Sequence, residues 1–157
     1  MVRLAQVIAG LVGAGELASP AVPCQPPSRL GGNITAEQRE QTTVDLFALR
    51  GFDCGWAMAS VGNWKRSDGQ PQDLTTSDGY GIGFTTCVLR TEGGVPAEDS
   101  RLRKAVIWMK THQHASGCWF TRSLRENDEL DTYAVSVYVI LALSAFVEIP
   151  LPAAGRD

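Results

Sequence analysis

The sequence lacks the patterns that mark most metal-binding, nucleic-acid-binding and membrane-spanning proteins. No two cysteines form a CxxC pair, so neither a zinc knuckle nor a thioredoxin-like site is predicted. The formal net charge is -3 and no block of Lys and Arg occurs, so no nucleic-acid partner is predicted. No apolar run reaches the ~20 residues of a transmembrane helix, so no transmembrane span is predicted. The cysteines are Cys24, Cys54, Cys87 and Cys118.

Histidine is also scarce, and the chain contains 2 of them. His112, His114 and Cys118 could be imagined as metal ligands. Two histidines at positions i and i+2 of a helix end point to different faces, however, and no acidic partner is fixed beside them. We therefore expect surface histidines, no metal site and no cofactor.

No segment shows sustained alternation of apolar and polar residues, so strands are not predicted. A chain of 157 residues with 44% hydrophobic and 20% charged side chains suits one domain. N-caps, helical spacing of apolar residues, and terminal Gly and Pro predict helices instead. These are Ala36 to Arg50, with Gly51 as a left-handed terminator; one between Ser77 and Gly93; one from about Asp99 to His112; and Asp131 to Val147. The predicted fold class is all-α.

Residues 1–34 differ from the helical part, and two interpretations of them stay open. Arg3, the apolar residues after it and the small residues near Ala18 have the layout of a secretory signal, in which case the protein is exported. Alternatively, residues 2–17 form an amphipathic first helix and the protein stays in the cytoplasm. A linker rich in Pro and Gly follows, from Ser19 to Gly32. We expect the helical domain to span residues 35–149 and residues 150–157 to be a tail.

The last predicted helix is apolar on all sides. From Tyr133 to Val147 only Ser136 and Ser144 interrupt its apolar residues, so we expect it to be buried on every side. The helix before it has one apolar face, formed by Leu102, Ala105, Val106 and Met109. Helices with a polar face thus alternate with fully apolar ones. This alternation favours two concentric layers of helices.

The segment between these two helices has the residues that a tight reversal needs. Gln113 offers both a donor and an acceptor to the free backbone groups at the helix end. Gly117 permits a sharp backbone bend, and Trp119 can cover the polar groups with its ring. We interpret the three residues as a structural clasp.

The spacing around this clasp resembles the QW repeat of the squalene-hopene cyclase and protein prenyltransferase superfamily. The matching residues are Lys104, Ala105, Trp108, Met109, Gln113, Gly117 and Trp119. A degraded copy precedes them by 63 residues, with Trp56 at the place of Trp119. Arg50 there replaces Gln113 and Cys54 replaces Gly117, so we expect this first corner to be held less tightly. The resemblance implies a partial α/α toroid built from antiparallel helix pairs.

In that superfamily the starts of the inner helices line the central cavity. The resemblance therefore makes Asp78, Tyr80, Asp128 and Tyr133 candidates for cavity-facing residues. The proton donor of the cyclases is the middle carboxyl of an Asp-x-Asp-Asp run, and Leu130 stands at its place here. Asp131 is then either a helix N-cap or a surviving cavity acid, and it is the weak candidate for a catalytic residue. The Asp-x-Cys zinc pattern of the prenyltransferases and the Cys-Gly-Glu-Gln run of thioester-containing toroids are both missing.

Two hypotheses follow from the resemblance and from the small number of helices. In the first, the chain is a noncatalytic helical repeat domain whose apolar inner face binds an isoprenoid or a protein partner. The partner is then a second copy or the missing portion of a toroid. In the second, the chain is the terminal part of a functional terpenoid cyclase.

Overall fold

The described part of the chain folds entirely into helices and loops. The computed structural model describes residues 35–62, 65–124 and 128–146, and none of these residues lies in a strand. The helices are α2 (Ala36–Ala48), α3 (Met58–Val61), α4 (Gly79–Thr91), α5 (Ser100–Thr111) and α6 (Asp128–Ala145). The predicted all-α class is therefore confirmed for these residues. The signal or first helix, the linker and the tail lie outside them.

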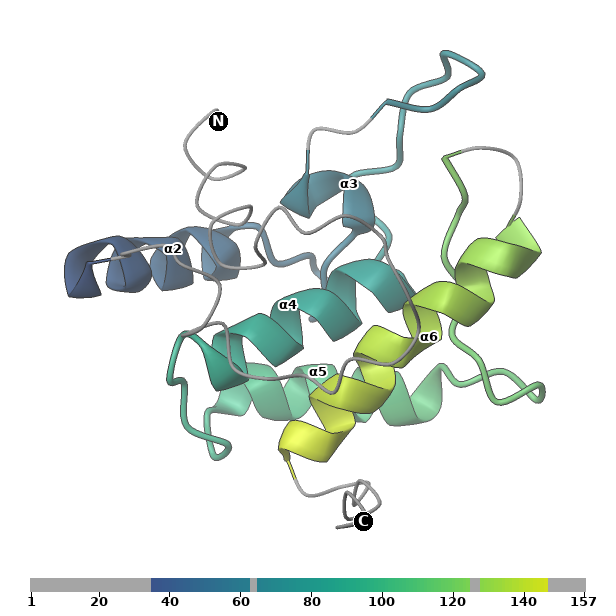
Figure 1. Ribbon diagram of the computed structural model, residues 1–157. Coiled ribbons are helices and arrows are strands. Elements are labelled where there is room, and N and C mark those ends of the chain that lie inside the picture. Colours follow the sequence, from purple (N-terminus) through teal and green to yellow (C-terminus); the bar gives the residue numbers. More distant parts are fainter. Residues whose placement is uncertain (1–34, 63–64, 125–127, 147–157) are drawn as a thin grey trace, which may run out of the picture.

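The long helices alternate in direction along the chain. In Figure 1, α2 and α5 run one way, whereas α4 and α6 run the other way, and α6 crosses in front of α5. The closest packing between helices is that of α4 on α6. None of the described helices is long and apolar enough to cross a membrane.

Local sequence signals account for most helix ends. Thr35 caps α2 and forms a capping box with Gln38, as predicted. The end of this helix was predicted incorrectly, since α2 stops at Ala48 and the next residue stays right-handed. Gly51 is not in the left-handed region, and the nearby residue with positive φ is Cys54, at 72°. The prediction of Gly51 as a left-handed terminator was wrong because a glycine permits this conformation without requiring it.

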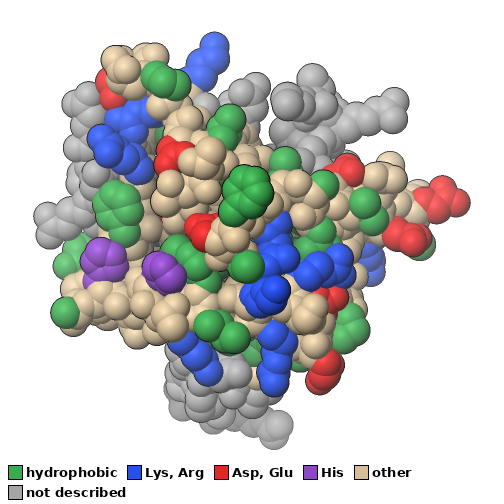
Figure 2. Space-filling model, turned by 180° about the vertical axis from the view of Figure 1, so that it is seen from behind, with side chains coloured by type: hydrophobic (Ala, Val, Ile, Leu, Met, Phe, Trp, Pro, Cys, Tyr) green, Lys and Arg blue, Asp and Glu red, His purple; other side chains and the backbone are tan. Residues whose placement is uncertain are grey.

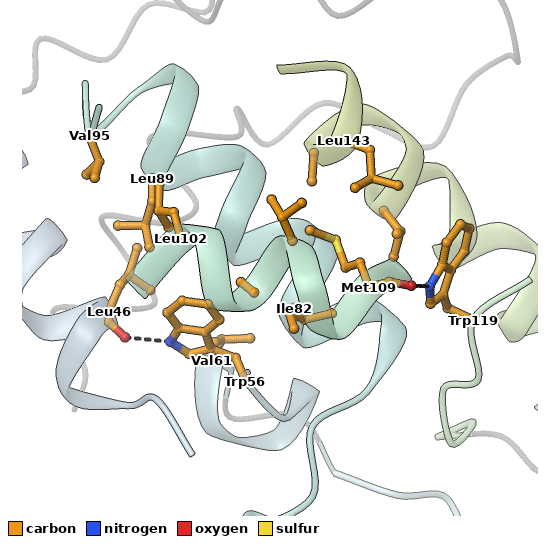
Figure 3. Close-up of a cluster of buried hydrophobic side chains, with 14 residues drawn as sticks. Leu46, Trp56, Val61, Ile82, Leu89, Val95, Leu102, Met109, Trp119 and Leu143 are labelled. Atoms are coloured by element: carbon orange, nitrogen blue, oxygen red, sulfur yellow. Dashed lines mark hydrogen bonds between the residues drawn. The ribbon is translucent and has the colours of Figure 1, made fainter. Parts of the chain in front are cut away.

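The core is a cluster of buried apolar side chains from α2, α3, α4, α5 and α6 (Figure 3). The predicted apolar face of α5 is confirmed, because all four of its residues are buried. Ile82 and Leu89 of α4 are fully buried in the same cluster. The opposite side of α5 carries exposed basic residues, and Figure 2 shows Lys and Arg side chains gathered on this side of the molecule, with the two histidines beside them. These residues are Arg101, Arg103, Lys104 and Lys110.

Complete burial of the last helix was a wrong prediction. Val135, Val139, Ala142 and Leu143 of α6 are buried. In contrast, Tyr133, Val137 and Ile140 are 56%, 52% and 38% exposed. These three residues recur at steps of four and three along α6, so they share one face, which we call the α6 face. An apolar composition made every side of the helix fit for burial, but α4 and the Trp119 corner cover only one side.

Candidate functional site

The two tryptophan corners are built alike. Trp119 is buried, and its indole Nε1 donates a hydrogen bond to the carbonyl of Met109, at 2.5 Å. Trp56 is also buried, and its Nε1 donates to the carbonyl of Leu46, at 2.6 Å. Both bonds are drawn in Figure 3. In each case the indole of a tryptophan that follows the corner donates to a carbonyl near the end of the preceding helix, α2 or α5, and such a bond is part of the role predicted for Trp119.

A side-chain hydrogen bond inside the Trp119 corner has a counterpart in the Trp56 corner. Gln113 Nε2 donates to the carbonyl of Gly117 at 2.9 Å, and Arg50 Nε donates to the carbonyl of Cys54 at 3.1 Å. Gly117 has φ 85° and Cys54 has φ 72°, so both occupy the left-handed region. The weaker hold expected for the first corner is therefore not seen in its hydrogen bonds. Its one disadvantage is a non-glycine residue at positive φ.

The remaining residues of the QW-like set differ in their environment. Ala105 is buried in the core, whereas Lys104 on the same helix is exposed. Trp108 is half-buried and stacks on the ring of His112, with ring centroids 4.2 Å apart. Among the described residues no group of His, Cys, Asp and Glu could hold a metal ion.

Asp78 joins three segments at the start of α4. Its carboxylate caps α4 by accepting a hydrogen bond from the Gly81 N–H at 2.9 Å. It also accepts one from the Met58 N–H at 2.6 Å and one from the Thr121 hydroxyl at 3.2 Å. Burial raises the pKa of this carboxyl, although the hydrogen bonds act in the opposite direction. Since both oxygens already accept hydrogen bonds from the protein, Asp78 acts as a structural anchor.

Tyr80 lies in an aromatic cluster between α4 and α6. Its ring stacks on Phe84 at 5.5 Å, and Tyr138 meets both rings edge-on at 5.3 and 5.7 Å. Burial raises the pKa of Tyr80 to about 12. Tyr80 thus packs between α4 and α6, and its phenol stays protonated at neutral pH.

Helix α6 begins earlier in the sequence than predicted. Helix α6 begins at Asp128, whose side chain lies outside the described structure, so Asp131 stands in the first turn. Its interpretation as the N-cap was therefore wrong. The predicted start came too late because an aspartate within the first turn carries the same local preference as a cap. Asp131 is half-buried and Tyr133 is exposed.

A cleft of about 440 Å³ opens beside the start of α4. It is lined by charges of both signs, among them Asp68, Asp73, Asp78 and Arg122. A hydrogen bond from Arg66 holds the pKa of Asp68 at about 2, and the Thr75 and Thr76 side chains keep the pKa of Asp73 well below its usual value. These two carboxyls are therefore ionised above acidic pH. The cleft combines these charges with apolar side chains, among them Met58, Phe120 and Leu124.

The comparisons with known proteins do not place the chain in a family. No model of a protein family matches the sequence, no curated protein matches it significantly, and no solved structure does so.

Three polar residues of these corners were not predicted from the sequence. The Thr121 hydroxyl accepts a hydrogen bond from the Tyr80 N–H at 2.8 Å, and the Ser136 hydroxyl accepts one from the Trp119 N–H at 3.0 Å. Arg50 was noted only as a replacement for Gln113. The 63-residue period could have suggested the role of Arg50, because it aligns two side chains that can each donate to a carbonyl four residues on.

Proposed function

We propose that the chain is a noncatalytic helical repeat module of the squalene-cyclase-like type, and that it binds a protein helix through the α6 face. The observation that carries this proposal is the exposure of three large apolar side chains on one side of α6. From residue 132 to residue 146 the helix and the residue after it have no charged side chain. A continuous, uncharged apolar strip is typical of an interaction surface.

The shape of the strip favours a helix over an isoprenoid. Small apolar ligands bind in concave sites that enclose most of their surface. The α6 face is instead a ridge of side chains spaced as helices present them, and such ridges pack into the grooves of another helix. The alternative proposal, the terminal part of a functional terpenoid cyclase, needs a carboxyl that can protonate an alkene. Of the candidate acids, Asp78 is occupied by three hydrogen bonds.

The proposal predicts that dilute protein binds a hydrophobic fluorescent dye at the α6 face. Val137→Lys should abolish most of the fluorescence increase, because a charge in the middle of the strip prevents burial of the dye. Ile107→Lys is the matched control, since Ile107 is 60% exposed on α5, outside this face. Near-ultraviolet circular dichroism should be unchanged in both variants. Equal dye binding by the wild type and Val137→Lys would overturn the assignment of the face.

A further inference from the structure

The cleft beside the start of α4 has walls from separate parts of the chain, and hydrogen bonds hold these walls together. One wall is the loop between α3 and α4, and another is the segment that leads from α5 to α6. Arg66 Nη1 donates to the carbonyl of Ser123 at 3.1 Å. The Ser67 N–H donates to the carbonyl of Leu124 at 2.8 Å. The protein itself thus fixes the shape of the cleft, and its volume of about 440 Å³ is typical of small-molecule sites.

Most charged groups of the cleft are already bonded within the protein. The guanidinium of Arg66 donates hydrogen bonds to both carboxylate oxygens of Asp68. Asp78 accepts hydrogen bonds on both of its oxygens. Asp73 and Arg122 differ from these, since neither forms an ion pair within the described part of the chain. One anion and one cation of the cleft are therefore left for a ligand.

Asp73 has one carboxylate oxygen that the surrounding loop does not use. Its Oδ1 accepts hydrogen bonds from the Thr75 N–H at 2.7 Å and from the Thr75 hydroxyl at 2.6 Å. The same oxygen accepts a third bond, from the Thr76 N–H at 3.2 Å, and none of the three reaches Oδ2. These bonds also keep the pKa of the carboxyl well below its usual value, so it is negatively charged at neutral pH.

Phe120 and Arg122 lie on the same side of the other wall. Residues 119, 121 and 123 are buried, whereas Phe120 and Arg122 between them are exposed, and both line the cleft. The ring of Phe120 is 44% exposed. Met58 and Leu124 add apolar surface to the same cleft. This wall thus combines a cation with an apolar surface on which a side chain can pack.

We infer that the cleft binds a zwitterionic ligand with an apolar side chain, which is either a free amino acid or a short peptide. The ammonium group of the ligand binds Oδ2 of Asp73, and its carboxylate binds the guanidinium of Arg122. Its side chain packs on Phe120. An apolar ligand such as an isoprenoid would instead remove both charges from water without a partner. The site lies apart from the α6 face and does not depend on the proposed function.

Titration of the isotope-labelled full chain with L-leucine and with leucyl-leucine, followed by amide chemical shifts, tests the inference. At least one of the two should cause saturable shifts in residues 73–76 and 120–124, and the tighter one identifies the source of the ligand. The N-acetylated form of this ligand has no ammonium group, and the C-terminal amide has no carboxylate. Each of these forms should bind about tenfold more weakly or worse, because one charged group of the protein then stays unpaired.

Variants of the two charged residues should respond to the two modified ligands differently. Asp73→Asn should weaken binding of the unmodified ligand about tenfold but leave the affinity for the N-acetylated form unchanged. Asparagine keeps an acceptor for the Thr75 N–H, so the loop should be retained. Arg122→Gln should weaken binding of the unmodified ligand but not of the amide. Glu40→Gln and Arg103→Gln change exposed charges outside the cleft and should bind as the wild type does.

The following outcomes would overturn the inference. Neither L-leucine nor leucyl-leucine causes saturable shifts, or the N-acetylated form binds as tightly as the unmodified ligand. A variant that weakens every form of the ligand equally would show that the residue shapes the cleft and does not contact the ligand charge. Shifts confined to residues outside the cleft would place the site elsewhere. None of these results bears on the α6 face, which the dye measurement tests separately.

Discussion

At the residue scale, the two corners differ most at the position with positive φ. Gly117 and Cys54 hold the same left-handed backbone conformation, and the surrounding hydrogen bonds correspond. A residue with a Cβ atom is strained in this region by roughly 1–2 kcal/mol, whereas glycine is not. The Trp56 corner therefore keeps its geometry despite the backbone strain at Cys54, because the hydrogen bonds of Trp56 and Arg50 hold the chain on both sides of this residue.

Replacing each of these two residues by the other type, in separate variants, should change the free energy of unfolding in opposite directions. Cys54→Gly should raise the free energy of unfolding by about 0.5–1 kcal/mol, since relief of strain exceeds the added entropy of the unfolded glycine. Gly117→Cys should lower it by about 1 kcal/mol through the same strain. Chemical denaturation under reducing conditions measures both variants. Changes of the same sign would show that the corners are not equivalent.

At the element scale, Asp78 joins the short helix α3, the start of α4 and the segment that leads from Trp119 to α6. Each of its three hydrogen bonds comes from a different place in the sequence: Met58, Gly81 and Thr121. Asp78 therefore caps α4 and also connects the two halves of the described chain. The position cannot be filled equally well by asparagine, because an amide offers one acceptor oxygen in place of two.

Asp78→Asn should lower the free energy of unfolding by about 1–3 kcal/mol, because a backbone N–H then faces an amide donor. The size of this loss should depend on pH. Burial raises the folded-state pKa of Asp78 above its ordinary value of 3.8, so between the two pKa values the folded state binds more protons than the unfolded state. The contribution of Asp78 to stability therefore decreases as pH rises through this window.

The stability difference between the wild type and Asp78→Asn should accordingly narrow as pH rises above the ordinary pKa of 3.8. Denaturation curves of both proteins at a series of pH values give this difference directly. Lowered pKa values at Asp68 and Asp99 are common to both proteins and cancel in the comparison. A difference that widens with pH would contradict the burial of an ionisable group at this position.

At the scale of the whole molecule, the contact between α4 and α6 joins the two halves of the described chain. Its closest point is Gly83, where a Cβ atom would meet the backbone of Tyr138 and Val139 at 2.8 and 2.6 Å. Backbone atoms cannot move aside as the end of a flexible side chain can. The aromatic cluster of Tyr80, Phe84 and Tyr138 lies at the same junction.

Gly83→Ala should lower the free energy of unfolding by about 1–3 kcal/mol through overpacking, although alanine is the better helix former. Thermal unfolding followed by tryptophan fluorescence tests this, since Trp56 and Trp119 are buried in the two corners. Glu40→Ala, an exposed change in α2, should alter stability by less than about 0.5 kcal/mol. A Gly83→Ala variant as stable as the wild type would contradict the close approach of the two helices.

The sequence by itself determined the all-α class, the approximate positions of the four long helices and the clasp of Gln113, Gly117 and Trp119. These features depend on residues within a few turns of one another, so caps, apolar spacing and glycine predict them. Tertiary structure decided which side of α6 is bare, that Asp78 anchors three segments, and that Arg50 replaces Gln113 in function as well as in position. Those outcomes depend on contacts between distant residues: an apolar helix has no local signal for the side that its neighbours leave uncovered, and a carboxylate has none for the donors that will surround it.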